Sequence, residues 1–154
     1  MSKSYLILYC AIFFQFVGCV SSKKEIYVKD NARILSLEFI KSLNSNITKG
    51  YEKSKVQIIV YTINSIDNIK SLDEYTIDLI SKTDFGHSGF RQSVVMILYP
   101  DEGWVFMRWG ESIKARIDTI EVNKVIDSMK TFFKKNDFFN GINFGVERIY
   151  ALIK

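Results

Sequence analysis

Two apolar runs in the middle of the chain decide the fold: Val56-Gln57-Ile58-Ile59-Val60-Tyr61-Thr62-Ile63 and Ser93-Val94-Val95-Met96-Ile97-Leu98-Tyr99. Both are almost continuously apolar and rich in β-branched residues, which predicts strands buried on both faces of a sheet. Between them, Ser71 followed by Glu74 has the spacing of a capping box and predicts a helix. Strand, helix and strand in succession predict a parallel pair joined by a right-handed crossover.

Downstream of this unit, a turn at Pro100 to Gly103 leads back into Trp104 to Trp109. This arrangement predicts a third strand, antiparallel to the second. Helices are expected at about 119–135 and 138–153. Asn136-Asp137 separates these two helices.

Upstream of it, Ser36 can cap a helix that ends near Gly50. The apolar positions of this helix recur at helical spacing: Leu37, Ile40, Leu43 and Ile47. The element order is therefore α-β-α-β-β-α-α. It predicts an α/β fold, a three-layer α/β/α sandwich around a small mixed sheet that combines a βαβ crossover with an antiparallel hairpin.

Length and composition fit one globular domain, which we place at residues 26–154. The chain has 154 residues, of which 47% are hydrophobic and 25% are charged, with a net charge of +4. The positive charges are interleaved with acidic residues, and no basic stripe with aromatic platforms is visible. We therefore expect no nucleic-acid partner.

Residues 1–18 have the pattern of a secretory signal peptide. Lys3 is followed by an apolar run from Tyr5 to Phe14, which continues through Val17 and ends at Gly18-Cys19. The run is shorter than the roughly 20 apolar residues that span a bilayer comfortably. The alternative is a buried N-terminal helix or strand, but a core helix would have a polar face and this segment has none.

The junction Phe16-Val17-Gly18-Cys19 resembles the lipobox of bacterial lipoproteins. This resemblance implies that Cys19 carries fatty acids such as palmitate and becomes the first residue of the mature protein. Residues 19–25 would then form a lipidated tether, and Cys10 would be lost with the signal. The expected partner is the membrane, with the protein lipid-anchored at the cell membrane or outer membrane and facing the periplasm or the cell surface.

Three aspartates are candidate metal ligands. Asp30 precedes a predicted helix, Asp101 follows the second strand and Asp118 precedes the next helix. Carboxylates from several loops can converge on Ca²⁺ or Mg²⁺, which prefer oxygen ligands. The alternative is that they are a loop residue, a turn residue and a helix cap. Because the third strand is antiparallel, residues 110–118 would have to bring Asp118 back to the other two.

Arg108 and Lys114 are candidate anion-binding residues, because both are positively charged, Arg108 near the end of the third strand and Lys114 shortly after it. His87 is the only histidine and lies in Gly86-His87-Ser88-Gly89. Without an orienting carboxylate nearby, it is interpreted as a residue of a surface loop rather than as a nucleophile. The pairs Phe132-Phe133 and Phe138-Phe139 predict one partly exposed ring each, because neighbours on a helix point about 100° apart.

Four short segments, taken in order, carry a resemblance to a known family. They are Asp30-Asn31-Ala32, Gln57-Ile58-Ile59-Val60, Gly110-Glu111-Ser112-Ile113-Lys114 with the later Asp118, and Phe138-Phe139-Asn140-Gly141-Ile142. In this pattern the chain resembles the TPM domain family of small exported α/β domains, over about residues 26–153. The resemblance implies metal binding or, as in a plant member, acid phosphatase activity. The chain has Ser93 and Ser112 where the family has glycines, and Lys114 where it has a glutamate.

Three functions are compatible with these features. The first is a lipid-anchored envelope protein whose TPM-like domain is a binding or accessory module for membrane or envelope proteins. The second is a metal-dependent phosphatase that uses Ca²⁺ or Mg²⁺. The third is a surface-exposed lipoprotein that binds ligands outside the cell.

The lipid anchor gives the first testable prediction. Cys19→Ser should abolish incorporation of labelled fatty acid and leave the precursor uncut, because acylation of this thiol precedes cleavage at lipobox sites. Cys10→Ser is the matched control and should change neither. A Cys19→Ser protein that is still lipidated and retained in membranes would contradict the lipoprotein interpretation.

Overall fold

The computed structural model describes residues 27–64, 71–85 and 89–153. Cys19 and His87 lie outside these residues. The strands are β1 (Val28–Asp30), β2 (Gln57–Thr62), β3 (Ser93–Tyr99) and β4 (Trp104–Trp109). The helices are α1 (Leu37–Ser54), α2 (Leu72–Lys82), α3 (Glu111–Lys114), α4 (Thr119–Phe133) and α5 (Phe138–Leu152), with 3₁₀ turns at Phe90–Gln92 and Pro100–Glu102.

The four strands form one mixed sheet in the order β1-β2-β3-β4. β2 and β3 are parallel, with Gln57 opposite Ser93. β4 is antiparallel to β3, with Trp109 opposite Val94. These pairings confirm the predicted crossover and hairpin. β1 was not predicted; it adds a parallel edge strand, with Val28 opposite Val60.

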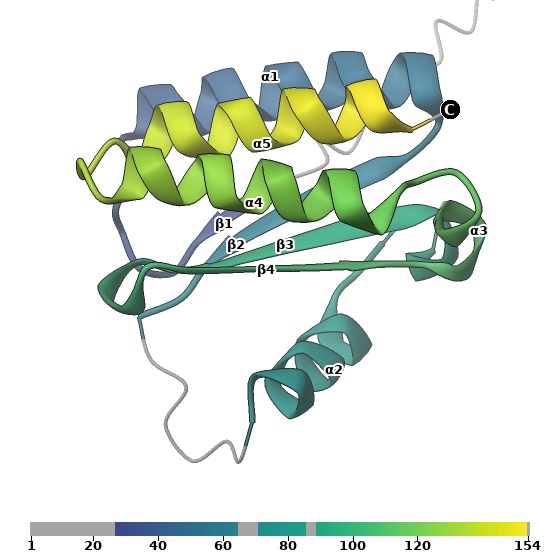
Figure 1. Ribbon diagram of the computed structural model, residues 1–154, viewed down its shortest axis with the longest axis horizontal. Coiled ribbons are helices and arrows are strands. Elements are labelled where there is room, and N and C mark those ends of the chain that lie inside the picture. The colour runs from purple at the N-terminus through teal and green to yellow at the C-terminus, as the bar shows by residue number, and fades with distance from the viewer. Residues whose placement is uncertain (1–26, 65–70, 86–88, 154) are drawn as a thin grey trace, which may run out of the picture.

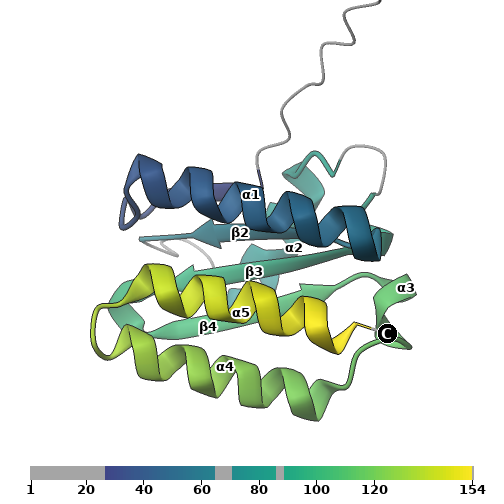
Figure 2. The ribbon, with the colours of Figure 1, turned by 90° about the horizontal axis from the view of Figure 1, so that it is seen from above.

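Helices cover both faces of the sheet, which confirms the three-layer sandwich. In Figure 1, α1, α4 and α5 lie above the sheet and α2 lies below it. Viewed from above, α1 lies on the side of β1 and β2, α5 lies over the other half of the sheet, and α4 lies along the outer side of β4 (Figure 2).

Alternating strand residues build one core on each face. The larger core lies under α1, α4 and α5 and includes Ile58, Val60 and Met96, all inaccessible to solvent. The smaller core lies against α2 and includes Ile59, Val95 and Ile97. All six residues of β2 are buried, as predicted for a central strand.

The helix starts follow the capping residues. Ser36 accepts a hydrogen bond from Phe39 N, and Ser71 accepts one from Glu74 N, both at 3.2 Å. α1 continues past Gly50 and ends at Ser54, where Lys55 adopts a left-handed conformation. The expectation that Leu37 belongs to the core face of α1 was wrong, because this first-turn residue is 77% exposed.

α1 and α5 lie close together at Gly50. A Cβ atom there would lie 2.2 Å from the ring of Tyr150, so only glycine fits without displacing the ring. The Tyr150 hydroxyl lies 3.1 Å from the carbonyl oxygen of Ile47 and 3.2 Å from that of Val56. Burial raises the pKa of Tyr150 above its usual range, since the phenolate would lose its hydration. Tyr150 thus joins two helices to the start of β2.

A fragment beginning at Glu25 should fold without any thiol chemistry, and Ile59→Asp should unfold it. Ile59 is 1% exposed, so the carboxylate would be buried without a partner and lower the free energy of unfolding by more than about 4 kcal/mol. Ile77→Asp on α2 is the control, because Ile77 is 63% exposed and the same change should stay within about 0.5 kcal/mol. Urea denaturation of the three proteins measures both effects. A cooperative, near-normal transition for Ile59→Asp would contradict this position of β2.

Candidate functional site

The carboxylate of Asp30, at the end of β1, organises the loop that leads into α1. Its Oδ1 accepts a hydrogen bond from Ile34 N at 3.2 Å, and its Oδ2 accepts one from Leu35 N at 2.9 Å. The hydroxyl of Thr62, at the end of β2, also donates to Oδ1. That hydroxyl oxygen accepts from Ala32 N at 3.1 Å. Both carboxylate oxygens of Asp30 are thus engaged in shaping the loop.

Asp118 caps α4, with its Oδ1 2.8 Å from Ile120 N. It lies at the other end of the sheet from Asp30, because antiparallel β4 carries the chain back to the start of β3. There Gly110 N donates to Ser93 O at 3.0 Å. Residues 110–118 do not return to the end of β1.

Asp101 lies in the exposed turn after β3, at the same end of the sheet as Asp30 but two strands away. Strands are spaced by about 4.8 Å, which puts roughly 10 Å between the ends of β1 and β3. The structure therefore does not bring the three aspartates into one cluster. Among the described residues, no group of three or more His, Cys, Asp or Glu side chains is placed to hold a metal ion.

Arg108 and Lys114, by contrast, line the same pocket at the open edge of β4. The pocket has a volume of about 480 Å³ and is lined by Phe106, Met107, Arg108, Trp109, Glu111 and Lys114. Two cations and one carboxylate line the pocket, and the guanidinium of Arg108 also pairs with Asp73 on α2. Lys114 has no ion-pair partner among the described residues, so it is the group best placed to bind an anion.

Arg108 has only part of its hydrogen-bonding capacity in use. Its guanidinium pairs with Asp73 on α2 and lies 5.4 Å from the centre of the Phe106 ring. The ion pair is exposed on both sides, so it contributes at most about 1 kcal/mol to stability. Nε is buried and has no hydrogen-bond partner in the part of the chain that the structure describes.

The turn into α3 depends on Gly110. A Cβ atom at this position would lie 2.1 Å from the carbonyl oxygen of Phe90, a contact with backbone that cannot simply move away. The glycine therefore lets β4 and α3 approach the turn before β3 closely. This packing places Lys114 beside the end of β4.

A series of side-chain hydrogen bonds on the α2 side of the sheet was not predicted from the sequence. Lys29 Nζ lies 2.8 Å from the Tyr61 hydroxyl, which lies 2.6 Å from Thr83 Oγ1. Thr83 in turn donates to Leu79 O at 2.6 Å. Because Thr83 gives its proton to Leu79, Tyr61 must donate to Thr83 and accept from Lys29. This series of hydrogen bonds links the edge strand β1 to the end of α2.

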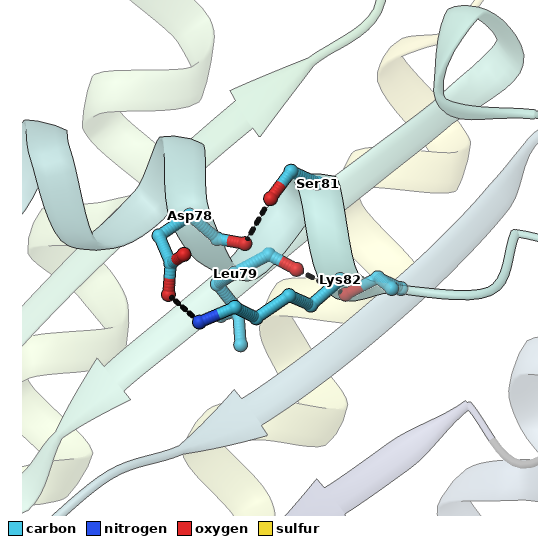
Figure 3. A network of polar contacts seen from close by, with 5 residues as sticks. Asp78, Leu79, Ser81 and Lys82 are labelled. Carbon is cyan, nitrogen blue, oxygen red and sulfur yellow. Dashed lines mark hydrogen bonds and ion pairs between the residues drawn. The ribbon is translucent and has the colours of Figure 1, made fainter.

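Local contacts close the last turn of α2 next to this series of hydrogen bonds. Figure 3 shows Lys82 paired with the Asp78 carboxylate and the Ser81 hydroxyl bonded to the Asp78 carbonyl, each at 2.7 Å. Burial raises the pKa of Tyr75, and the nearby Tyr61 and Asp78 raise it further. No sequence motif marks this arrangement, because Lys29 lies in a strand that only its pairing with β2 defines.

The family model of the TPM domain matches residues 28–152. No curated protein matches the chain. Within the described residues, no helix is both long and apolar enough to span a bilayer.

Several solved structures share the fold. The N-terminal domain of a protein from P. gingivalis has a TM-score of 0.71 at 19% identity, over 85% of this chain and 83% of that one. The BA42 protein of Bizionia argentinensis has 0.67 at 13% identity, over 77% and 80%. The N-terminal domain of the cg2496 protein of Corynebacterium glutamicum has 0.65 at 14% identity, over 99% and 90%. At these identities the likeness shows the fold alone.

The positions of the aspartates give a stability prediction. Adding calcium should leave the melting temperature unchanged, because a ligand stabilises only a site that the native state forms, and Asp30 and Asp118 lie at opposite ends of the sheet. Asp118→Ala should lower stability by about 1 kcal/mol as the loss of a cap. Asp30→Asn should lower it by about 1–3 kcal/mol, since one acceptor oxygen of a partly buried carboxylate is lost. A calcium-dependent rise in melting temperature that either variant removes would instead establish a cation site.

Proposed function

Because this chain belongs to the TPM domain family, we propose that it is a lipid-anchored protein of the bacterial cell envelope whose domain binds a membrane or envelope protein. The anchor is supported by the apolar run that ends in Gly18-Cys19. The binding role is supported chiefly by the sheet edge at β4 and by the pocket that Arg108 and Lys114 line beside it. The proposed location is the cell membrane or outer membrane, with the domain facing the periplasm or the surface.

The tether favours a partner close to the bilayer. Eight peptide units separate Cys19 from Tyr27, the first described residue. At about 3.5 Å per residue this segment reaches at most roughly 28 Å. The proposed domain therefore works within a short distance of the lipid surface, where membrane proteins and their extramembrane segments are its neighbours.

A metal-dependent phosphatase is the second candidate, favoured by one observation: Arg108 and Lys114 line a pocket that suits a phosphate group. Phosphoryl transfer also needs a positioned nucleophile and concentrated positive charge. The carboxylates proposed as metal ligands are engaged elsewhere, Asp30 in its loop and Asp118 as a cap. Glu111 also lines the pocket and opposes a phosphate dianion. Binding without hydrolysis therefore fits these residues better.

The proposal is tested by crosslinking on intact cells, followed by purification of the tagged full chain from detergent-solubilised membranes. We expect the same partner protein to copurify with the wild type and with Ile77→Asp. It should be absent with Ile59→Asp, which keeps the anchor but loses the folded domain.

Two results would contradict the proposal. One is recovery of the same proteins with Ile59→Asp, which would make the anchor alone responsible. The other is metal-dependent hydrolysis of a chromogenic phosphate ester by the purified chain, lost in Asp30→Asn, which would establish the phosphatase instead. Protease accessibility on intact cells then separates a periplasmic from a surface-facing domain.

A further inference from the structure

Among the described residues, β4 is an edge strand whose outer side pairs with no other strand. Gly110 N donates to the O of Ser93, the residue directly opposite on β3, so these two residues form a hydrogen-bonded pair. Hydrogen-bonded and non-hydrogen-bonded pairs alternate along an antiparallel ladder. Phe106 and Arg108 therefore also direct their backbone groups to β3. Val105, Met107 and Trp109 direct theirs away from the sheet. Their N–H and C=O groups are positioned to pair with a further strand.

The two faces beside this edge differ. On one face, α4 lies along the outer side of β4, so a strand added there would be sheltered by the helix (Figure 2). On the other face, β4 presents Trp104, Phe106 and Arg108, which alternate along the strand. Trp104 is 47% exposed and packs edge-on against Tyr99, with ring centres 6.2 Å apart. An added strand would therefore meet aromatic rings near the start of β4 and charge near its end.

The charge at this end favours an acidic side chain. Four consecutive residues of β4, from Phe106 to Trp109, line the pocket together with Glu111 and Lys114. Lys114 is exposed and has no ion-pair partner among the described residues. Arg108 is already paired with Asp73, and its Nε is buried. Lys114 is therefore the cation available to an acidic side chain of the partner.

The position of α4 also argues against a second copy of this chain as the occupant. Pairing β4 with β4 of another copy would place the two strands about 4.8 Å apart. Each α4 lies on the outer side of its own β4, so the two helices would meet, although packed helices need about 8–10 Å between their axes. A single extended segment without such a helix avoids this clash.

We propose that the outer edge of β4 binds an extended peptide segment of a partner protein by strand addition. The segment carries an acidic side chain that pairs with Lys114, and an apolar side chain against Phe106 and Trp104. The proposal rests on the binding role described above and names its surface and its partner's chemistry. Backbone hydrogen bonds would supply affinity, and the alternating side chains specificity.

The test uses the full chain in detergent solution and a phage-displayed library of random eight-residue peptides. Selected peptides should share an acidic residue and alternate apolar or β-branched ones. On binding, amide hydrogen exchange should slow at Val105, Met107 and Trp109. It should change little at Phe106 and Arg108, which already bond to β3. Only strand addition produces this alternation.

Charge reversal at Lys114 provides the matched variant. Lys114→Glu should weaken binding of the selected peptides by about tenfold or more, measured by fluorescence polarisation. Lys49→Glu makes the same change at an exposed position of α1 and should not alter it. Retention of binding by Lys114→Glu, or protection of amides without the alternation, would reject the proposal. Failure to enrich any peptide, or concentration-dependent dimers with protection of the same amides, would reject it as well.

The membrane experiment separates this proposal from the broader one. A partner crosslinked equally by the wild type and Lys114→Glu would leave the binding role intact and exclude this edge. Loss of that partner with Lys114→Glu but not with Lys49→Glu would support both.

Discussion

The parallel pairing of β2 with β3 is the constraint on which the rest of the structure depends. Every residue of β2 is buried, and so is β3 from Ser93 to Leu98. Two such strands must be covered by helices on both faces, and their backbone groups must find partners on both sides. β4 provides the hydrogen-bond partners on the outer side of β3. β1 provides them on the outer side of β2, where Val60 N donates to Tyr27 O at 2.7 Å. The short β1 is therefore required by its neighbour rather than by its own sequence.

This dependence explains how much of the fold could be predicted. β2 and β3 were predictable because long β-branched runs leave few alternatives, and α2 because Ser71 caps it. β1 has three residues, too few for any periodicity, and exists only through its pairing with β2. Leu37 was misplaced because helical spacing identifies a face but does not show where the neighbouring layer ends. α3, with four residues, is likewise defined by its packing against the turn before β3.

The candidate site was predictable in its residues and less so in its geometry. Each aspartate could be recognised as a ligand or as a cap, and only the direction of β4 shows that Asp118 lies far from Asp30. Arg108 and Lys114 belong to no common sequence motif, yet the structure places them in the lining of one pocket. Gly110 brings them together, because the missing Cβ allows α3 to fold back beside the strand. Lys114 stands where the family pattern has a glutamate. Because this position is exposed, the reversal of charge does not disturb the core.

The positions of the two sheet edges relate the proposed anchor to the proposed binding surface. The tether enters at β1, and β4 is the opposite edge, about 14 Å away across three strand spacings. The proposed anchor at Cys19 would attach at the β1 edge, so it would not cover the β4 edge, which would stay accessible to a neighbour. The three outward residues of β4 offer about six backbone hydrogen bonds, each worth roughly 1 kcal/mol net before the entropy of ordering a peptide is subtracted. Such a contact is weak in dilute solution. The proposed confinement of both partners to one membrane would raise their effective concentration and let a short edge strand serve as a selective binding surface.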